Sequence, residues 1–567
     1  MSTVVETLEE RLHAALNTLG LRVDQTFQVV PAADGRYGDY QTNAGMVLAK
    51  ERRENPRQLA IRIAEALNVQ GISKPPEVAG PGFINFRLEN HFVAARVIDA
   101  YADPRLGVRQ TNNSKTLIIE FSSPNIAKPM HVGHIRSTIL GDVLARVARF
   151  IGHTVITDNH LGDWGTQFGK VIYGWKNLSD QAALAKRPVE ELLRLYRAAD
   201  AASKEDPVIL EACRNELIKL QQGDRENNEI WQKCIQLSKA EFAGIYRILG
   251  VDFDQQLGES FYNSELPTTV DRLLKTGLAE LSEGAVVVWD RQISEAPFMI
   301  RKSDGGFGYA STDVTTLEYR VRRWNPDAIW YVVGTPQQLH FQQLFSLARK
   351  LGMKLDLQHV AFGSILGEDR KLMRTRSGDS VPLQELLEEA VTRAEKLVIE
   401  KNPELDRGEV EQIGQIVGIG AIKYAELSQH RLTDYVFSWS KMLSFQGNTA
   451  PYLQNAYVRS RAIFRRLKEP FHPPSQIELG EPAEQKLAKK LLQFGEVVPA
   501  VLDGFRPNVL ANFLYELAAE YHVFYEQCPV LSAEAEQRNQ RLLLSDLFAR
   551  TLRLGLQLLG IEVPERM

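Results

Sequence analysis

The chain has 567 residues, of which 44% are hydrophobic and 24% are charged, and this ordinary composition excludes an intrinsically disordered protein. A net charge of −4 gives no general attraction for phosphates, so any RNA contact must come from local basic surface. The three widely spaced cysteines, Cys213, Cys234 and Cys528, exclude a disulfide framework and a zinc knuckle. We find no run of about 18 apolar residues for a membrane span and no signal peptide, so we expect a cytoplasmic protein without membrane contact.

Residues 1–108 mix helical and strand patterns, which predicts an α+β domain at the N-terminus. Apolar residues recur at helical spacing in Val4–Leu19 and in Pro56–Leu67. A tight turn at Gly80–Gly82 precedes a short strand, Phe83–Phe86. The length of the chain makes three or four domains reasonable, and this is the first of them.

A new unit begins with Thr116–Phe121, a continuous β-prone run that suits a strand buried on both faces of a parallel sheet. Apolar residues at helical spacing then predict a helix from Ile135 to Phe150, which Gly152 ends. The run Thr154–Thr157 is the next predicted strand. Strand, loop, helix and strand form a βαβ unit, the start of a doubly wound, Rossmann-type parallel sheet.

Two further regions follow this βαβ unit. Residues 176–300 are polar and largely helical, which indicates a helical subdomain inserted in the sheet, and the sheet resumes at Ala328–Val333. We therefore assign residues 115–405 to one α/β domain. Residues 410–567 have helical periodicity nearly throughout, with a proline-rich break at Phe471–Pro474, and we expect a separate all-α helical bundle there.

The loop after the first α/β strand is the candidate nucleotide site. It ends in His131-Val132-Gly133-His134 at the start of the predicted helix. Two imidazoles can donate to phosphate oxygens beside the positive end of a helix dipole, and Gly133 lets a flat adenine approach the backbone. By itself the tetrapeptide is a modest signal, since two surface histidines that cap a helix, or a pair of histidines that binds a metal, would give the same sequence pattern. Its place directly after the first strand of a βαβ unit favours phosphate binding.

Two longer segments carry a family resemblance. The segment Glu120–Asp142, EFSSPNIAKPMHVGHIRSTILGD, resembles the HIGH signature of class I aminoacyl-tRNA synthetases in its arginine-specific form. Leu161–Gly169, LGDWGTQFG, is similar to the stretch that follows the signature in arginyl-tRNA synthetases. The similarity extends from the GDYQTNA segment at Gly38 to the final residues, PERM, and so covers nearly the whole chain.

The resemblance implies an arginine–tRNA ligase. Such an enzyme activates L-arginine with ATP to arginyl-adenylate and transfers the arginine to tRNA(Arg), releasing AMP and diphosphate for use in protein synthesis. It further implies Mg²⁺ with ATP, no structural metal, a monomer, and arginine activation that requires bound tRNA. Two rival readings stay open: a synthetase or smaller HxGH nucleotidyltransferase for another substrate, and a noncatalytic RNA-binding descendant of a synthetase.

The second family signature, the KMSKS loop, matches Gly367–Gly378. The pentapeptide Met373–Ser377 departs from it, because the first lysine is absent and Arg376 stands where the second would be. Adenylyl transfer needs positive charge on the phosphates rather than one particular lysine, so Lys128, Arg374 and Arg376 can share this task. The alternative is a solvated basic loop. The expected catalytic residues are His131, His134, Lys128 and Arg376, and the expected ATP-binding residues are His131, Gly133, His134, Met373 and Arg374.

An arginine pocket must offer carboxylate acceptors to a guanidinium that is always charged. Glu120, at the end of the first strand, and Asp313 are the candidates. Tyr309 precedes Asp313 by four residues and shares a helix face with it if a helix begins there. Asp313 taken alone reads more readily as a helix N-cap. The resemblance implies that Glu120, Tyr309 and Asp313 bind the guanidinium and that Asn125 and Gln337 bind the ammonium end, and no editing domain is expected.

Aromatic and arginine residues alternate from Asn448 to Arg461 and on to Arg466, a pattern that can stack on splayed bases and pair with phosphates. The alternative is an amphipathic helix whose aromatic residues lie in the core. The resemblance implies that the C-terminal domain binds the anticodon and the N-terminal domain binds the corner of the tRNA. The expected tRNA contacts are Tyr457, Arg461 and Met567 in the former and Phe83 and Asn85 in the latter.

Overall fold

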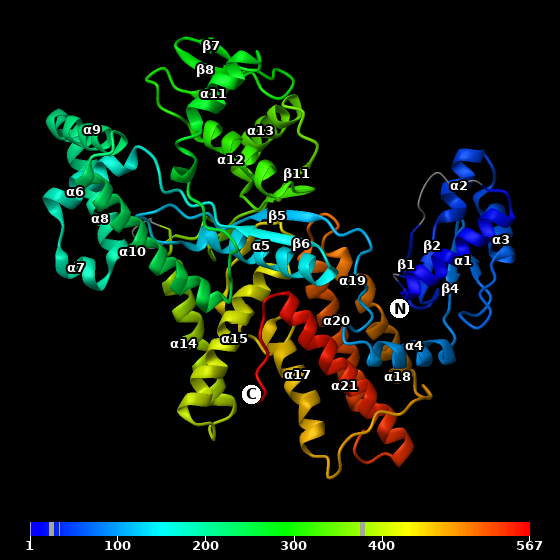
Figure 1. Ribbon diagram of the computed structural model, residues 1–567. Helices are drawn as coiled ribbons and strands as arrows, with labels where there is room; N and C mark the ends of the chain where they lie inside the picture. The colour runs from blue at the N-terminus through cyan, green and yellow to red at the C-terminus, as the bar shows by residue number, and fades with distance from the viewer. Residues whose placement is uncertain (1, 22–27, 33, 375–379) are drawn as a thin grey trace. The chain divides into compact units, whose positions relative to one another are not determined.

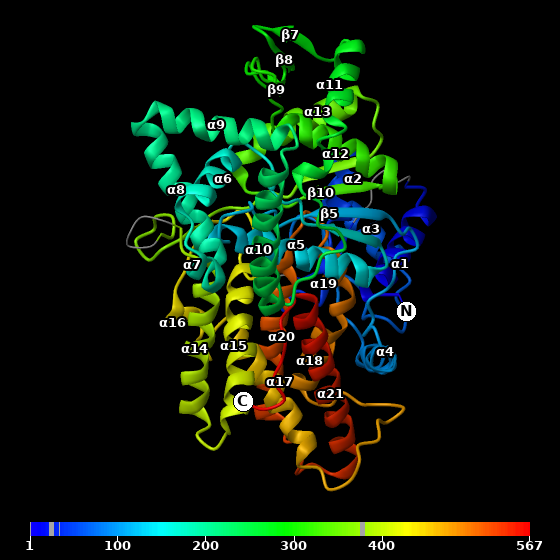
Figure 2. The same ribbon diagram turned by 60° about the vertical axis from the view of Figure 1, so that its left-hand side comes forward.

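The computed structural model describes residues 2–21, 28–32, 34–374 and 380–567, which divide into two compact units (Figures 1 and 2). The first unit comprises Met1–Gln110, Phe445–Gln557 and Glu562–Met567, and the second comprises Thr111–Ser444 with Leu558–Ile561. No helix in the described part of the chain is long and apolar enough to cross a membrane.

The N-terminal part of the first unit is an antiparallel sheet covered by helices, as predicted. The sheet has the strand order β1-β2-β4-β3. Helix α1 is capped at its N-terminus by Thr3, whose hydroxyl accepts from the N–H of Glu6 while the Glu6 carboxylate accepts from the N–H of Thr3. The elements are α1 (Val4–Thr18), β1 (Val29–Pro31), β2 (Tyr40–Thr42), α2 (Ala44–Arg52), α3 (Pro56–Ala66), β3 (Glu77–Ala79), β4 (Phe83–Phe86) and α4 (Asn90–Ala102).

The C-terminal part of the first unit is helical. Its core includes Tyr521 and Phe548, whose rings stack with centroids 3.7 Å apart. The Lys489 ammonium pairs with the Asp39 carboxylate at 2.9 Å, so the helices and the N-terminal sheet belong to one packed body. The helices are α17 (Ala450–Arg465), α18 (Pro482–Leu492), α19 (Phe494–Ala500), α20 (Pro507–Gln527) and α21 (Ala535–Leu558).

A four-stranded parallel sheet organises the second unit. Its strands are β5 (Thr116–Glu120), β6 (Thr154–Asp158), β10 (Ala328–Tyr331) and β11 (Asp356–His359), in the order β11-β10-β5-β6. From β5 the chain builds β6 on one side and later returns to build β10 on the other. The reversal between β5 and β10 is the topological switch point, where doubly wound sheets bind their ligands.

Helices cover both faces of this sheet. Helix α5 (Val132–Ile151) lies on one face, and α12 (Tyr309–Trp324) and α13 (Gln338–Lys350) lie on the other (Figure 1). The predicted stop of α5 is confirmed, because Gly152 caps it with φ of 108°, a conformation that glycine adopts without strain.

The rest of the second unit contains two sheets that the sequence did not predict. Within the insertion, which was expected to be largely helical, β7 to β9 form a three-stranded antiparallel sheet, and further along the chain β12 and β13 form a parallel pair. The paired helices α14 and α15 lie side by side (Figure 2). The elements are α6 (Gln167–Leu178), α7 (Gln181–Lys186), α8 (Pro188–Glu205), α9 (Pro207–Gln221), α10 (Arg225–Leu249), η1 (Glu259–Tyr262), α11 (Leu266–Lys275), β7 (Glu280–Ser282), β8 (Ala285–Val288), β9 (Phe298–Arg301), η2 (Thr335–Gln337), β12 (Ile365–Leu366), α14 (Leu383–Lys401), α15 (Arg407–Leu427), β13 (Tyr435–Val436) and α16 (Trp439–Met442). The predicted fold class, a Rossmann-type sheet with an N-terminal α+β part and a helical C-terminal part, is confirmed.

Candidate active site

Four residues in register mark the carboxyl edge of the parallel sheet. Asp158 of β6 lies opposite Glu120 of β5, Glu120 lies opposite Tyr331 of β10, and Tyr331 lies opposite His359 of β11. Residues at one register position project from the same face of a sheet. Glu120 and Tyr331 flank the switch point, so this row of side chains borders the expected ligand site.

The loop after β5 has a strained backbone. The φ values of Ser122, Ser123 and Ala127 are 71°, 48° and 63°. They lie in the left-handed region, which residues other than glycine rarely adopt. Side chains of other elements hold this conformation: the Ala127 N–H donates to Ser238 Oγ of α10 at 3.0 Å, and Ser122 Oγ lies 2.8 Å from the Tyr246 hydroxyl of the same helix. The strain is therefore located where the sequence predicts nucleotide binding.

The two segments that carry the family resemblance meet at Asn125 and Gly162. The N–H of Ile126 donates to the Gly162 carbonyl at 3.0 Å, and the N–H of Gly162 donates to the Pro124 carbonyl at 3.1 Å. A Cβ at Gly162 would lie 2.1 Å from Oδ1 of Asn125, so only glycine fits against this side chain.

The two histidines of the HVGH segment stand at the N-terminus of α5. Nδ1 of His131 accepts from the N–H of Gly133, and Nδ1 of His134 accepts from the N–H of His131, each at 3.1 Å. Burial, together with the charge of Lys128, lowers the pKa of His131, and burial with the charge of His131 lowers the pKa of His134 to about 3. Both rings are thus neutral near pH 7. In His131, Nδ1 accepts a backbone N–H, which places the ring proton on Nε2, the nitrogen that can donate to a phosphate. Nδ1 of His134 lies 3.1 Å from the backbone nitrogen and 3.3 Å from the carbonyl oxygen of His131, so this contact allows either tautomer.

A pocket of about 270 Å³ opens at the start of α5, near the lower end of the roughly 300–1,000 Å³ usual for ligand sites. It joins the HVGH segment to the segment expected to match the KMSKS loop. Its lining residues are His131, Val132, Gly133, Arg136, Gly334, Pro336, Phe362, Gly363, Ser364, Ile365, Leu372, Met373, Arg374 and Ser380.

The other expected phosphate ligands lie in different surroundings. The ring of His134 lies 4.1 Å from that of His131. Lys128 is exposed, with its ammonium 5.4 Å from the centre of the Tyr196 ring, a cation–π distance. Arg376 lies outside the described residues.

Arg136 lines the same pocket and was not predicted as a site residue. Its side chain is 1% exposed and pairs with Glu426 of α15, which is equally buried. It also donates to the Thr433 carbonyl at 3.1 Å. A buried ion pair that lost one partner would leave an uncompensated charge, so Arg136 and Glu426 hold α5 and α15 together beside the pocket.

The two carboxylates expected to bind arginine each have a basic side chain as a partner within the protein. Glu120 Oε2 accepts from Nη2 of Arg320 at 2.5 Å, and Asp313 Oδ2 lies 2.5 Å from Nε2 of His340. Both acids also act on the hydroxyl of Tyr331. Burial raises the pKa of this hydroxyl, the charge of Arg320 opposes the increase, and the negative charges of Glu120 and Asp313 add to it. Glu120 and Asp313 therefore face a common region at the sheet edge.

The remaining predicted arginine ligands are on the surface around this region. Helix α12 begins at Tyr309 with Gly308 as its N-cap, so the capping alternative for Asp313 is wrong, and Tyr309 and Asp313 share a helix face. Tyr309 is 74% exposed, and Asn125 and Gln337 are exposed as well. All three predicted side chains are thus accessible to a ligand.

Glu259, at the start of η1, is an acid that the sequence analysis missed. Burial, followed by the negative charges of Asp313 and Asp163, raises its pKa to about 8. No local motif distinguishes it, because its neighbours come from segments about 50 and 100 residues away. Asp313 thus links Glu259 to Glu120 in one cluster of acids, in which Glu259 holds a proton near pH 7.

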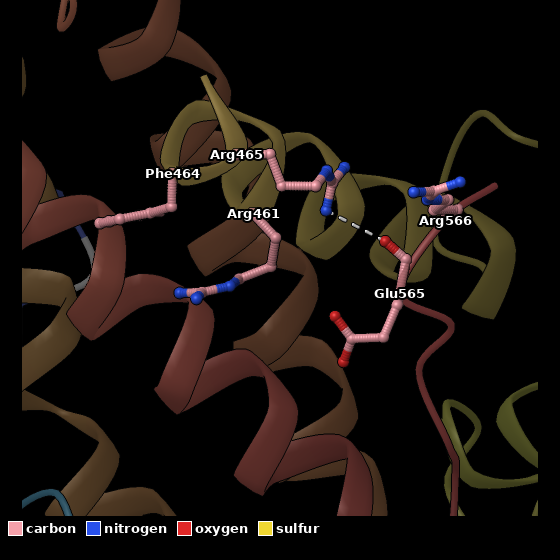
Figure 3. Close-up of a pocket in the computed structure, with 5 residues that line it drawn as sticks. All are labelled: Arg461, Phe464, Arg465, Glu565 and Arg566. Atoms are coloured by element: carbon pink, nitrogen blue, oxygen red, sulfur yellow. Dashed lines mark hydrogen bonds between the residues drawn. The ribbon is translucent and has the colours of Figure 1, made fainter. Parts of the chain in front are cut away.

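A second pocket, of about 340 Å³, lies in the first unit between α17 and the C-terminal segment (Figure 3). Arg461, Phe464 and Arg465 line it from α17, and Glu565 and Arg566 line it from the other side. Arg465 donates to the Glu565 carbonyl at 3.1 Å. Its predominantly basic lining suits a phosphate-bearing partner.

The expected tRNA contacts differ in exposure. Arg461 pairs with Asp546 at 2.6 Å and keeps 31% of its side chain exposed, while Phe83 and Met567 are half-buried. Tyr457 and Asn85 are 3% and 4% exposed, so neither offers a surface to RNA in this conformation. Their role in binding stays a prediction.

An aromatic groove between α17 and α20 was not singled out from the sequence. Tyr452 and Arg459 line it from α17, and Tyr525 lines it from α20. The Arg459 guanidinium lies 5.2 Å from the centre of the Tyr525 ring. Tyrosine and arginine side chains that remain accessible are the groups on which bases stack.

Comparison with known proteins gives consistent matches along the chain. The family model "tRNA synthetases class I (R), catalytic domain" matches residues 96–439. "Arginyl tRNA synthetase N terminal domain" matches residues 6–88, and "DALR anticodon binding domain" matches residues 453–567.

Individual relatives cover the chain from end to end. Arginine–tRNA ligases of Laribacter hongkongensis and Cellvibrio japonicus are 42% and 44% identical to it, and the matches cover 100% and 99% of both chains respectively. The crystal structure of arginyl-tRNA synthetase from Plasmodium falciparum matches 100% of both chains with a TM-score of 0.87 and 29% identity. The Thermus thermophilus arginyl-tRNA synthetase matches 99% of this chain and 100% of its own with a TM-score of 0.83 and 25% identity. The chain therefore belongs to the arginyl-tRNA synthetase family of class I aminoacyl-tRNA synthetases.

Proposed function

We propose that the chain activates L-arginine with ATP and transfers it to tRNA(Arg), releasing AMP and diphosphate, as a monomer in the cytoplasm. The observation that carries this proposal is a nucleotide-sized pocket joined to a cluster of acids. The segment Gly334–His340, which includes η2 and the start of α13, connects them, since Gly334 and Pro336 line the pocket and His340 contacts Asp313. An acceptor for a cationic amino acid thus lies beside a site for ATP.

At the nucleotide, the work is positioning and charge stabilisation. Gly133 admits the adenine, and Met373 binds ATP as part of the altered KMSKS segment. Nε2 of His131 and of His134 donates to the phosphates as the arginine carboxylate attacks the α-phosphate. Lys128, Arg374 and Arg376 supply the positive charge of the altered KMSKS loop.

Mg²⁺ accompanies ATP in this proposal and adds positive charge at its phosphates. In the described ranges, no three His, Cys, Asp or Glu side chains gather as metal ligands.

At the amino acid, Glu120, Asp313 and Tyr309 bind the guanidinium, and Asn125 and Gln337 bind the ammonium group. Buried acceptors disfavour an analogue without matching donors, so lysine is rejected without editing. The 2′ hydroxyl of the terminal tRNA adenosine then attacks the arginyl carbonyl, and activation requires bound tRNA.

For tRNA, the proposal assigns the anticodon to the C-terminal helices and the tRNA corner to the N-terminal sheet. Arg461 and Met567 are the proposed anticodon contacts, with Tyr457 beneath them, and Phe83 and Asn85 are the proposed corner contacts. Tyr452, Arg459 and Tyr525 add an accessible stacking surface in the same helical bundle.

Pyrophosphate exchange, with each amino acid in turn and with or without bulk tRNA, tests the proposal. We expect exchange with arginine alone, and only when tRNA is present. Exchange driven by another amino acid would change the assigned specificity, and exchange with none would favour a noncatalytic RNA-binding protein. Sedimentation of the purified chain tests the monomer.

A further inference from the structure

Arg320 lies beneath the acid cluster, on the face of α12 that packs against the sheet. Its side chain is fully buried, with 0% exposed. Nη2 donates to Glu120 Oε2 at 2.5 Å and to Asp158 Oδ2 at 2.7 Å. One guanidinium thus bridges the two carboxylates that lie opposite each other at the ends of β5 and β6.

The register of the sheet explains why a cation is needed there. Because Glu120 and Asp158 are direct neighbours on adjacent strands, their charges repel each other in a region shielded from water. Asp158 is 0% exposed, and its Oδ1 has no hydrogen-bond partner in the described part of the chain. Without a fixed positive charge, one of the two acids would take up a proton, as in other close carboxyl pairs.

Of the three side chains Arg320, Glu120 and Asp158, only that of Glu120 is open to a ligand. The side chains of Arg320 and Asp158 are fully buried, whereas that of Glu120 keeps 10% of its surface exposed. Arg320 occupies Oε2 of Glu120, so the contact with an incoming guanidinium is left to Oε1.

We propose that Arg320 is a positioning residue for arginine, which keeps Glu120 ionised and directs a single carboxylate oxygen of Glu120 to the substrate guanidinium. The proposal rests on the proposed function, because it needs arginine to bind at Glu120. It makes the affinity for arginine depend on a guanidinium that the substrate never touches.

Few groups around Arg320 can titrate. The charged or titratable side chains that act on it are Glu120 of β5, Asp158 of β6, Tyr331 of β10 and Tyr262 of η1. Burial raises the pKa of both tyrosines, so they stay neutral between pH 6 and 9. Glu259, whose pKa is raised to about 8, and His340, whose pKa Asp313 raises against the effect of burial, also titrate in this range in both the wild type and the variant. The difference between the pH profiles of Arg320→Met and the wild type therefore reports on the two carboxyl groups.

The test measures kcat and KM for arginine and for ATP in tRNA aminoacylation from pH 6.0 to 8.5. We expect Arg320→Met to raise the KM for arginine at least about 10-fold at pH 6.5, less at pH 8.5, and to leave the KM for ATP unchanged. Adding Asp158→Asn should return the KM toward the wild-type value, since the negative charge directly opposite Glu120 is then removed. Arg322→Met is the matched control: it lies on the same helix in an exposed ion pair with Glu265 and should change the KM less than about twofold.

A purely structural Arg320 gives the opposite pattern, and that result would overturn the proposal. The double variant would be at least as impaired as Arg320→Met, and the KM would not respond to pH. If Arg320→Met is not recovered folded by circular dichroism, Arg320→Lys replaces it, because an ammonium keeps the charge but lacks the planar fork. The same rescue by Asp158→Asn is then expected.

Glu120→Gln separates this inference from the proposed function. If that variant leaves arginine use unchanged, arginine does not bind at Glu120 and the proposed site is wrong. If it impairs arginine use while Arg320→Met does not, only the role of Arg320 is refuted.

Discussion

The half-buried acid Glu259 predicts an unusual dependence of stability on pH. The perturbation is Glu259→Gln, which replaces the acid by a neutral side chain of the same shape. Burial and the charges of Asp313 and Asp163 raise the pKa of Glu259 from an ordinary 4.5 to about 8. At about 1.36 kcal/mol per pKa unit, this displacement corresponds to at most about 5 kcal/mol.

The sign follows from the protons bound in each state. Between pH 4.5 and about 8 the folded chain holds a proton on Glu259 that the unfolded chain has lost, so the stability of the wild type falls as the pH rises through this window. Below this window both states are protonated, and above it both are ionised. The glutamine does not titrate, so the variant should gain stability relative to the wild type from pH 5 to pH 8.5.

Thermal unfolding at pH 5 and at pH 8.5 measures this difference. We expect the variant and the wild type to have nearly the same Tm at pH 5, and the variant to melt several degrees higher at pH 8.5. Glu265→Gln, which removes the exposed partner of Arg322, is the control and should show no such divergence. A Tm difference that is the same at both pH values would refute the assignment of a raised pKa to Glu259.

Four further predictions concern the site. Gly162→Ala should lower kcat/KM for arginine about 10-fold or more, since its Cβ would overlap the side-chain amide of Asn125. Gly244→Ala, in open space on a helix, should be neutral or slightly stabilising, and equal kinetics of the two variants would contradict this reasoning. His134→Ala should cost about 2 kcal/mol or more in the activation barrier, and an unchanged kcat would exclude a role at the phosphates. Asp313→Asn should lower kcat/KM for arginine by an amount that corresponds to about 3 kcal/mol of lost transition-state stabilisation, with the KM for ATP unaltered. An equal loss for both substrates would indicate general damage to the fold. Tyr525→Ala should raise the KM for tRNA about 10-fold and leave that for arginine as it was; a tRNA KM within twofold of wild type would remove the stacking role.

The catalytic sheet was predictable because its signals are local. An unbroken β-prone run predicts a buried strand. The spacing of apolar residues and the glycine at the end predict α5. The sheet of β7 to β9 was missed because its strands are three or four residues long. Their pairing depends on packing against other segments rather than on local preference.

The site divides along the same line. The HVGH segment and Glu120 follow directly from a strand and a helix start, so their place could be read from the chain. The roles of Arg320 and Glu259 depend on partners about 50 to 200 residues away in the sequence, and no local pattern reveals these contacts. Likewise the aromatic spacing of α17 could not decide that Tyr457 faces the core while Tyr452 lines a groove, because that depends on which neighbouring helix covers each face.

The hydrogen bonds from α10 to the loop after β5 have a practical consequence for protein engineering. Ser238 and Tyr246 support the backbone at Ala127 and Ser122, although they belong to a region that interrupts the sheet in sequence and looks removable. A trimmed enzyme that lacks this helix would leave the loop free to relax into an ordinary conformation. Attempts to build a minimal adenylating fragment should therefore keep α10, or replace its two hydroxyl contacts by design.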